Sequence, residues 1–309
     1  MPKVGILFGM ENTFPPAVVE RINQVAAPDV TAEFITLGGV KMAEPSGYAV
    51  IIDRISHEIP FYRAYLKNAA LSGAYVINNP FWWSADDKFF NYALATKLGV
   101  AIPPTVILPH KEHPPNTTAQ SMRNLRYPLN WSEVFEYVGF PAFLKPFDGG
   151  GWRDVYKVES PKEFFTAYDQ THDLCMTLQR AVQFKEYFRC YVVGQEQVRI
   201  MLYDPRRPFH ERYVRESGGT PPELIARVER DCVTLCRALG YDLNTVEFAV
   251  EKGVPYAIDF MNPAPDADVH SVGQENFDWI VDAVAELACR KALESRTGPR
   301  EYRWSEFLR

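Results

Sequence analysis

The residues whose types and spacing could bind a ligand or support catalysis lie mainly in two stretches of the chain. The first is residues 140–158, FPAFLKPFDGGGWRDVYKV. Lys145 closes a short apolar run, three glycines (Gly149, Gly150 and Gly151) follow Asp148, and an alternating run then resumes. Glycine lets backbone N–H groups approach phosphate oxygens, and the lysine ammonium adds positive charge. The spacing differs from that of a P-loop. The stretch predicts a phosphate-binding hairpin, and an ordinary mobile hairpin with a surface lysine is the alternative.

The second stretch carries acids on a predicted hairpin near the C-terminus. Glu247 lies in VEFAV and Asp259 in YAIDFMNPAP, on either side of a turn at residues 251–253, and Asn262 follows. Neighbouring strands can therefore bring the acids together, and carboxylate and amide oxygens are the ligands that Mg²⁺ prefers. Solvated acids on a strand face are the alternative, which the apolar surroundings disfavour.

Composition excludes several classes of protein. The 309 residues carry a net charge of −6 with scattered Lys and Arg, which disfavours binding to nucleic acid or an anionic membrane surface. No apolar run approaches the ~18 residues of a membrane span. The five cysteines form no CxxC pair, so we expect core thiols, no zinc site and a reducing cytoplasm.

The elements that must position these residues form three predicted parts. Residues 1–103 alternate strands and helices and predict a parallel α/β domain, which ends with a helix that starts at Ser84 and carries Lys88. Residues 104–178 predict a small α+β lid around the glycine hairpin. Residues 179–309 predict an antiparallel subdomain with the acid hairpin and a final helix over 277–293.

Lys88, Lys145, the triple glycine and the acid hairpin, in this order, resemble the ATP-grasp superfamily. The match is to carboxylate–amine ligases of the glutathione-synthetase, D-alanine-ligase and ribosomal-protein glutamate-ligase kind. It extends over nearly the whole chain and includes DKFFNYALATKLGVAIPPT, which is similar to the family's lysine-bearing helix. The resemblance implies an α/β pre-ATP-grasp domain followed by an α+β ATP-grasp fold of two subdomains.

The resemblance also implies roles for individual residues. Those expected to bind ATP are Lys88, Lys145, Gly149, Gly150, Gly151, Gln179, Arg180, Ala181, Val182 and Glu186. Those expected to bind one or two Mg²⁺, with Mn²⁺ as a substitute, are Glu247, Asp259 and Asn262. The sequence departs from the family in two places. Asp259 and Asn262 are separated by two residues instead of one, so a bulge or recruitment of Asp266 or Asp268 is needed, and Gln-Arg replaces the commoner Gln-Glu at the hinge.

In such ligases a carboxylate attacks the γ-phosphate and an amine then displaces phosphate, while an arginine stabilises the oxyanion. Arg199 is our first candidate for that arginine, ahead of Arg189 and Arg212. Arg54 and His57, at the end of a parallel strand, are candidates for substrate recognition. Partners are expected to be small carboxylates and amines, with a homodimer left open. A non-catalytic ATP-binding module and a phosphotransferase without ligation are the alternative functions.

Overall fold

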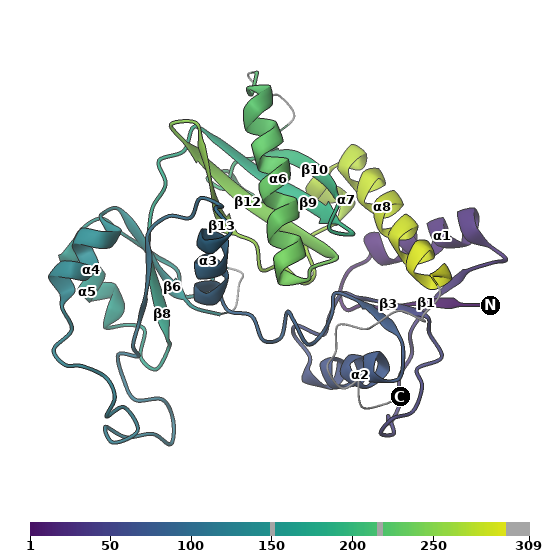
Figure 1. The fold of residues 1–309 in the computed structure, drawn as a ribbon, viewed down its shortest axis with the longest axis horizontal. Coiled ribbons are helices and arrows are strands. Elements are labelled where there is room, and N and C mark those ends of the chain that lie inside the picture. The colour runs from purple at the N-terminus through teal and green to yellow at the C-terminus, as the bar shows by residue number, and fades with distance from the viewer. Residues whose placement is uncertain (149–151, 215–218, 295–309) are drawn as a thin grey trace. The chain divides into compact units, whose positions relative to one another are not determined.

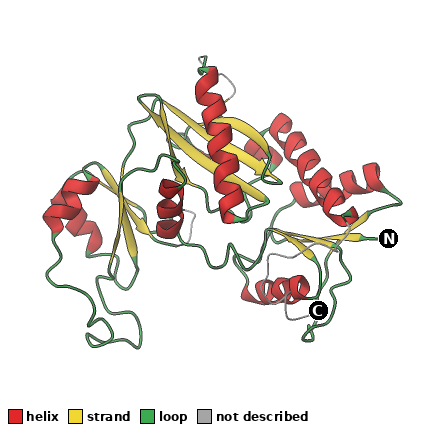
Figure 2. Cartoon of the chain, in the orientation of Figure 1, coloured by secondary structure: helices red, strands yellow, loops and turns green. Residues whose placement is uncertain are grey.

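The computed structural model describes residues 1–148, 152–214 and 219–294. The chain divides into two compact units, residues 1–80 together with the chain from 266 onward, and residues 81–265. Figures 1 and 2 show their helices and strands. No helix among the described residues is both long and apolar enough to cross a membrane.

The first unit is a parallel sheet covered by helices. The sheet has the order β2-β1-β3-β4, formed by β1 (Lys3–Leu7), β2 (Thr31–Phe34), β3 (Val50–Asp53) and β4 (Tyr75–Ile77). Helices α1 (Phe14–Ala26) and α8 (Gln274–Leu293) pack on each other on one face, and α2 (Pro60–Leu71) lies on the other (Figure 1). The short helix α7 (Val269–Val272) precedes α8. The prediction of a parallel α/β unit is confirmed.

The C-terminal helix is the main departure from the predicted division of the chain. We assigned residues 179–309 to the metal-bearing subdomain, but α8 packs on α1, β1 and β3 of the first unit. Its buried face, with Ile280, Val284 and Leu287, completes the core of a sheet whose strands all come from the start of the chain. The first unit also ends at Pro80 and not at residue 103, because α3 (Lys88–Lys97) packs within the second unit.

The lid sheet of the second unit is antiparallel and has the order β5-β8-β6-β7. Its elements are β5 (Thr105–Leu108), α4 (Trp131–Val138), β6 (Ala142–Pro146), β7 (Tyr156–Val158), α5 (Pro161–Tyr168) and β8 (Met176–Arg180). Our predicted boundary between residues 178 and 179 divides β8, which lies wholly in this sheet, between β5 and β6. Aromatic packing joins α4 to α5, since the Trp131 ring lies 5.4 Å from that of Phe164 and 6.0 Å from that of Phe135. Both helices share one apolar core with the strands of this sheet.

The second sheet of this unit has the order β11-β10-β9-β12-β13 and is antiparallel. Its elements are β9 (Glu186–Val193), β10 (Gln197–Tyr203), the 3₁₀ turn η1 (Phe209–Glu211), β11 (Tyr213–Val214), α6 (Pro222–Leu239), β12 (Leu243–Glu251) and β13 (Val254–Asp259). Helix α6 covers one face, where its apolar residues pack on β9 and β12 (Figure 1). Cys190, Cys232 and Cys236 are buried, free thiols in this core.

Candidate functional site

The β12–β13 hairpin brings the two predicted metal-binding acids opposite each other. Glu247 pairs with Asp259, whereas Phe248 pairs with Ala257, so Ile258 is the extra residue of a β-bulge. The turn uses Lys252 and Gly253 at φ of 52° and 77°, the left-handed values that a tight two-residue hairpin requires. The bulge therefore lies just before Asp259 and aligns this residue with Glu247. β13 ends at Asp259, so the bulge predicted between Asp259 and Asn262, with recruitment of Asp266 or Asp268 as its alternative, stays a prediction.

Glu247 is held by two side chains of the adjacent strand β9. The Tyr187 hydroxyl donates a hydrogen bond to its Oε2 at 2.5 Å, and Arg189 Nη1 lies 3.3 Å from its Oε1. Burial raises the pKa of Glu247; Arg189 opposes this rise, and the nearby charge of Asp259 adds to it. Two carboxylates held this close favour a bound cation, because a cation removes the repulsion and compensates the lost hydration.

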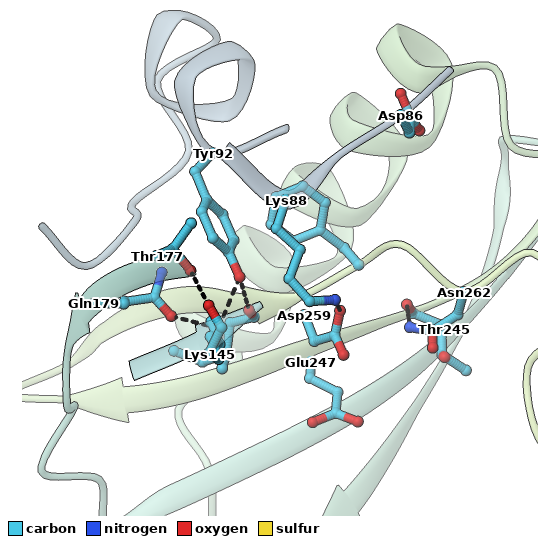
Figure 3. A network of polar contacts seen from close by, with 12 residues as sticks. Asp86, Lys88, Tyr92, Lys145, Thr177, Gln179, Thr245, Glu247, Asp259 and Asn262 are labelled. Atoms are coloured by element: carbon cyan, nitrogen blue, oxygen red, sulfur yellow. Dashed lines mark hydrogen bonds and ion pairs between the residues drawn. The ribbon is translucent and has the colours of Figure 1, made fainter. Parts of the chain in front are cut away.

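Helix α3 supplies the first predicted ATP lysine. Lys88 Nζ lies 3.8 Å from Asp259 Oδ1 (Figure 3). The Lys88 N–H donates to the carbonyl of Phe147. The helix begins later than predicted. Asp87, and not Ser84, is the N-cap, and its carboxylate accepts from the Phe90 N–H at 2.7 Å. Lys88 is therefore the first helical residue, beside the acids of the hairpin.

Lys145, on β6, is partly buried and held by two neutral acceptors. Its Nζ donates to the Tyr92 hydroxyl at 2.8 Å and to Gln179 Oε1 at 2.9 Å (Figure 3). The Tyr92 hydroxyl in turn donates to the carbonyl of Ile258, at the bulge, at 3.0 Å. Burial lowers the pKa of Lys145 from 10.5 to about 8, although Asp259 and Glu247 oppose the shift. The geometry thus connects the lid lysine to the acid hairpin through Tyr92.

One open pocket joins these groups. Its lining comes from both sheets of the second unit and combines apolar side chains with charged and amide groups. The pocket is lined by Lys88, Phe143, Lys145, Pro146, Asp148, Trp152, Arg153, Val155, Gln179, Arg180, Val182, Phe184, Tyr187, Pro205, Glu247, Ala249, Ile258 and Asp259. An apolar slot with a few convergent polar groups is the usual form of a small-ligand site.

The other predicted nucleotide residues lie in different surroundings. Ala181 is buried and its N–H donates to the carbonyl of Pro141. Glu186 accepts a hydrogen bond from the Thr220 hydroxyl at 2.9 Å and lines a neighbouring pocket with Arg206 and Arg207. The predicted phosphate flap, Gly149 to Gly151, lies outside the described residues.

Asn262, the third predicted metal ligand, is engaged with the backbone. Its Nδ2 donates to the carbonyl of Thr245 at 3.1 Å, and its N–H donates to Asn244 Oδ1 at 3.2 Å. Figure 3 shows its side chain beside Thr245, on the far side of Asp259 from Lys145. Among the described residues, no cluster of three or more His, Cys, Asp and Glu side chains has the arrangement of a metal site. The role of Glu247, Asp259 and Asn262 as metal ligands stays a prediction.

The three candidate arginines lie on or beside the same sheet. Arg189 reaches Glu247 and lies 5.5 Å from the centre of the Tyr203 ring. Arg199 pairs with Tyr191, so it shares the face of Arg189 but lies opposite the next residue on that face. Arg212 donates to the Tyr203 hydroxyl at 3.4 Å. Arg189 thus contacts the predicted metal ligand Glu247, and the choice among the three arginines, with Arg199 as our first candidate, stays a prediction.

The two candidate substrate residues belong to the first unit. Arg54 is buried just after β3, where it forms a two-pronged ion pair with Glu11 and its guanidinium lies 5.0 Å from the centre of the Phe14 ring. His57 is part-exposed, with its Nε2 3.7 Å from Glu58 Oε1. Their role in substrate recognition stays a prediction.

Two site residues escaped the sequence analysis. Tyr92 lies one helical turn after Lys88, so both side chains are on one face of α3, and Tyr187 is two residues before Arg189, so both point to one face of β9. These periodicities are visible in the sequence. Nothing local, however, shows that Tyr92 would meet Lys145 or that Tyr187 would meet Glu247.

No protein-family model matches this sequence, and no curated protein matches it. Solved structures do match. A D-alanine–D-alanine ligase from Bacillus anthracis complexed with ATP has a TM-score of 0.63 at 16% identity, over 96% of this chain and 99% of that one. The VanG D-Ala:D-Ser ligase from Enterococcus faecalis has a TM-score of 0.68 at 15% identity, over 94% and 99%. A RimK domain ATP-grasp protein from Sphaerobacter thermophilus has a TM-score of 0.64 at 15% identity, over 94% and 100%.

Since these identities are low, the likeness establishes the fold. The chain has the fold of the ATP-grasp ligases along nearly its whole length, and the predicted fold class is confirmed.

Proposed function

We propose that this chain is an ATP-dependent ligase that joins a carboxylate to an amine through an acyl phosphate. Fold alone does not assign a reaction, so the proposal depends on the site. The observation that carries it is a single pocket whose lining combines apolar side chains with Lys145, Lys88, Glu247 and Asp259. An adenine ring, a polyphosphate and a divalent cation need these three kinds of surroundings in one site.

The apolar slot suits a purine. Phe143 and Val155 from the lid, together with Val182, Phe184 and Ile258, line it. Lys145 is connected through Tyr92 to Ile258 of this slot, and Lys88 lies next to Asp259. Two ammonium groups placed in sequence can neutralise charge along a polyphosphate, which is most of what an enzyme contributes to phosphoryl transfer.

The acid pair fits Mg²⁺. Glu247 and Asp259 occupy opposed positions in the register, and the charge of Asp259 adds to the rise in the Glu247 pKa. A divalent ion bound by these two carboxylates would relieve their repulsion and would polarise the phosphates of the nucleotide. Asn262 would need to leave its bond to the Thr245 carbonyl, or bind through its remaining oxygen, to join them.

In the proposed reaction a substrate carboxylate oxygen attacks the γ-phosphorus, the bond to the β-phosphate oxygen breaks, and ADP leaves. The amine nitrogen then attacks the acyl carbon, a proton is lost from the nitrogen, and phosphate leaves. An arginine beside the acyl phosphate would stabilise the tetrahedral oxyanion. Arg189 packs against Glu247 on the sheet face of the pocket, and Arg199 shares that face.

The test is ADP release from Mg²⁺–ATP in the presence of a panel of amino acids and dipeptides. Lys145→Ala and Glu247→Ala should abolish release, and Lys157→Ala, at an exposed lysine paired with Glu159, is the matched control. Release that requires both a carboxylate and an amine, with a joined product, supports the ligase. Release with a phosphorylated product and no joining identifies a phosphotransferase, and binding of ATP with no release under any acceptor identifies a binding module.

A further inference from the structure

The segment that links the two sheets of the second unit is fastened at both ends. At its start, the N–H groups of Arg180 and Ala181 donate to the carbonyls of Pro104 and Pro141 in the lid. At its far end, the Lys185 N–H donates to the carbonyl of Val250 on β12. Between these points Val182 lines the pocket. The backbone of this segment is therefore held against the apolar slot from two directions.

A single carboxylate spans the segment. Glu251, the last residue of β12, accepts from Arg180 Nη1 through Oε2 at 2.9 Å and from the Gln183 N–H through Oε1 at 2.8 Å. Both bonds are charge-assisted, and such bonds are stronger than neutral ones. One carboxylate thus fixes the separation and the orientation of residues 180 and 183.

The Arg180 side chain has a second support. Its guanidinium lies 5.2 Å from the centre of the Tyr256 ring, on the neighbouring strand β13. The side chains of Arg180 and Glu251 are 26% and 16% exposed, so the pair is shielded more than a surface ion pair. Arg180, which replaces the commoner Glu of the family's Gln-Glu hinge, thus pairs with an acid at the β12–β13 turn, far along the chain.

We propose that Glu251, with Arg180, is a positioning device for the nucleotide base. It holds residues 180–183 in the one arrangement in which their backbone can face a purine in the slot. A preformed backbone edge costs less to bind and discriminates better between bases than a mobile one. Glu251 itself lies outside the residues that line the pocket and acts through the hinge. This inference rests on the proposed nucleotide site.

The test compares Glu251→Ala with the wild-type protein and with Glu159→Ala, which removes the acid of an exposed lid ion pair. We expect Glu251→Ala to weaken Mg²⁺–ATP binding about tenfold, as for one lost charged hydrogen bond, and to narrow the preference for ATP over GTP. The kcat at saturating ATP should stay within about twofold, because the hinge acts in binding. Hydrogen exchange of the Gln183 amide in the nucleotide-free protein should accelerate.

Arg180→Met supplies a second variant, since it keeps an apolar stem against Tyr256 and removes the charge. The double variant Arg180→Met/Glu251→Ala should bind ATP no more weakly than Glu251→Ala alone, because Glu251→Ala already breaks both the bond to Arg180 and the bond to the Gln183 N–H. A folded Glu251→Ala protein with unchanged affinity and base preference overturns the inference while the ATP site stands. Equal losses of affinity for ATP and GTP in Glu251→Ala, together with a lowered melting temperature, also overturn the inference. A wild-type protein that fails to bind Mg²⁺–ATP refutes the proposed function itself, and the hinge inference with it.

Discussion

The affinity for ATP should depend on pH through Lys145. Burial lowers the pKa of this ammonium from 10.5 to about 8. If only the charged form binds the phosphates, the fraction competent to bind is nearly complete at pH 7. At one pH unit above the pKa it is about a tenth, so the dissociation constant should rise about tenfold between pH 7 and pH 9.

Titration calorimetry of Mg²⁺–ATP at a series of pH values from 7 to 9.5 measures this profile. Lys145→Arg is the control, because a guanidinium keeps its charge across the whole range. The dissociation constant of this variant for Mg²⁺–ATP should be higher than that of the wild type if the larger guanidinium fits poorly, but it should not change with pH. A flat wild-type profile, or the same slope in both proteins, would refute the reasoning.

Burial of the Lys145 ammonium should also destabilise the nucleotide-free protein. The difference between the ordinary pKa of 10.5 and the pKa of about 8 in the folded protein corresponds to about 3 kcal/mol less free energy of unfolding below pH 8. Between pH 8 and 10.5 the unfolded chain binds more protons than the folded protein, so the free energy of unfolding should increase across that window. Lys145→Met removes this cost but also two charge-assisted hydrogen bonds worth about 1.5 kcal/mol each, so the two effects should nearly cancel at pH 7. A loss of stability above about 2 kcal/mol in denaturant titration would contradict this account.

Three further changes test other parts of the site and the lid. Glu247→Gln should remove Mg²⁺-dependent ATP binding, while the melting temperature should stay unchanged or rise because the variant no longer buries a carboxylate charge. Magnesium titration measures the first effect and thermal unfolding the second. An unchanged magnesium dependence would exclude Glu247 as a metal ligand. Tyr187→Phe removes the 2.5 Å bond to Glu247 and should weaken Mg²⁺–ATP about tenfold, an effect that would be absent if Tyr187 only fills space. Trp131→Ala should destabilise the protein by about 3 kcal/mol because Trp131 packs on Phe135 and Phe164, and a loss below about 1 kcal/mol in chemical denaturation would count against an aromatic lid core.

Much of the local structure follows from local rules. The alternating run and turn around residues 251–253 predict the acid hairpin, since two-residue turns with left-handed backbone favour residues such as Gly253. The parallel character of the first unit follows from its alternation of strands and helices. These features depend on close neighbours in the chain, so the sequence alone contains them.

Errors arose where the deciding contact is distant in the sequence. The strand from Met176 has the composition of either sheet, and its place between β5 and β6 is set by pairing with strands that precede α5 in the chain. The apolar face of α8 predicts that the helix packs on a core, but it does not indicate which core. The contacts with β1 and β3 therefore cannot be predicted from the sequence of α8. The helix start is the exception, a local error: Asp87, and not Ser84, has the extended backbone of the N-cap, and its carboxylate accepts from the Phe90 N–H.

The sequence by itself determined the candidate chemistry of this protein: two lysines, a glycine-rich hairpin and two acids flanking one turn, in an order that predicts an ATP-grasp fold. Only the tertiary structure decided how they meet. The bulge at Ile258 aligns Asp259 with Glu247, Tyr92 connects Lys145 to that bulge, and Glu251 supplies the acid for Arg180. The reason is physical. Periodicity sets which face of an element a side chain occupies, but sheet pairing and burial set which distant side chain it meets.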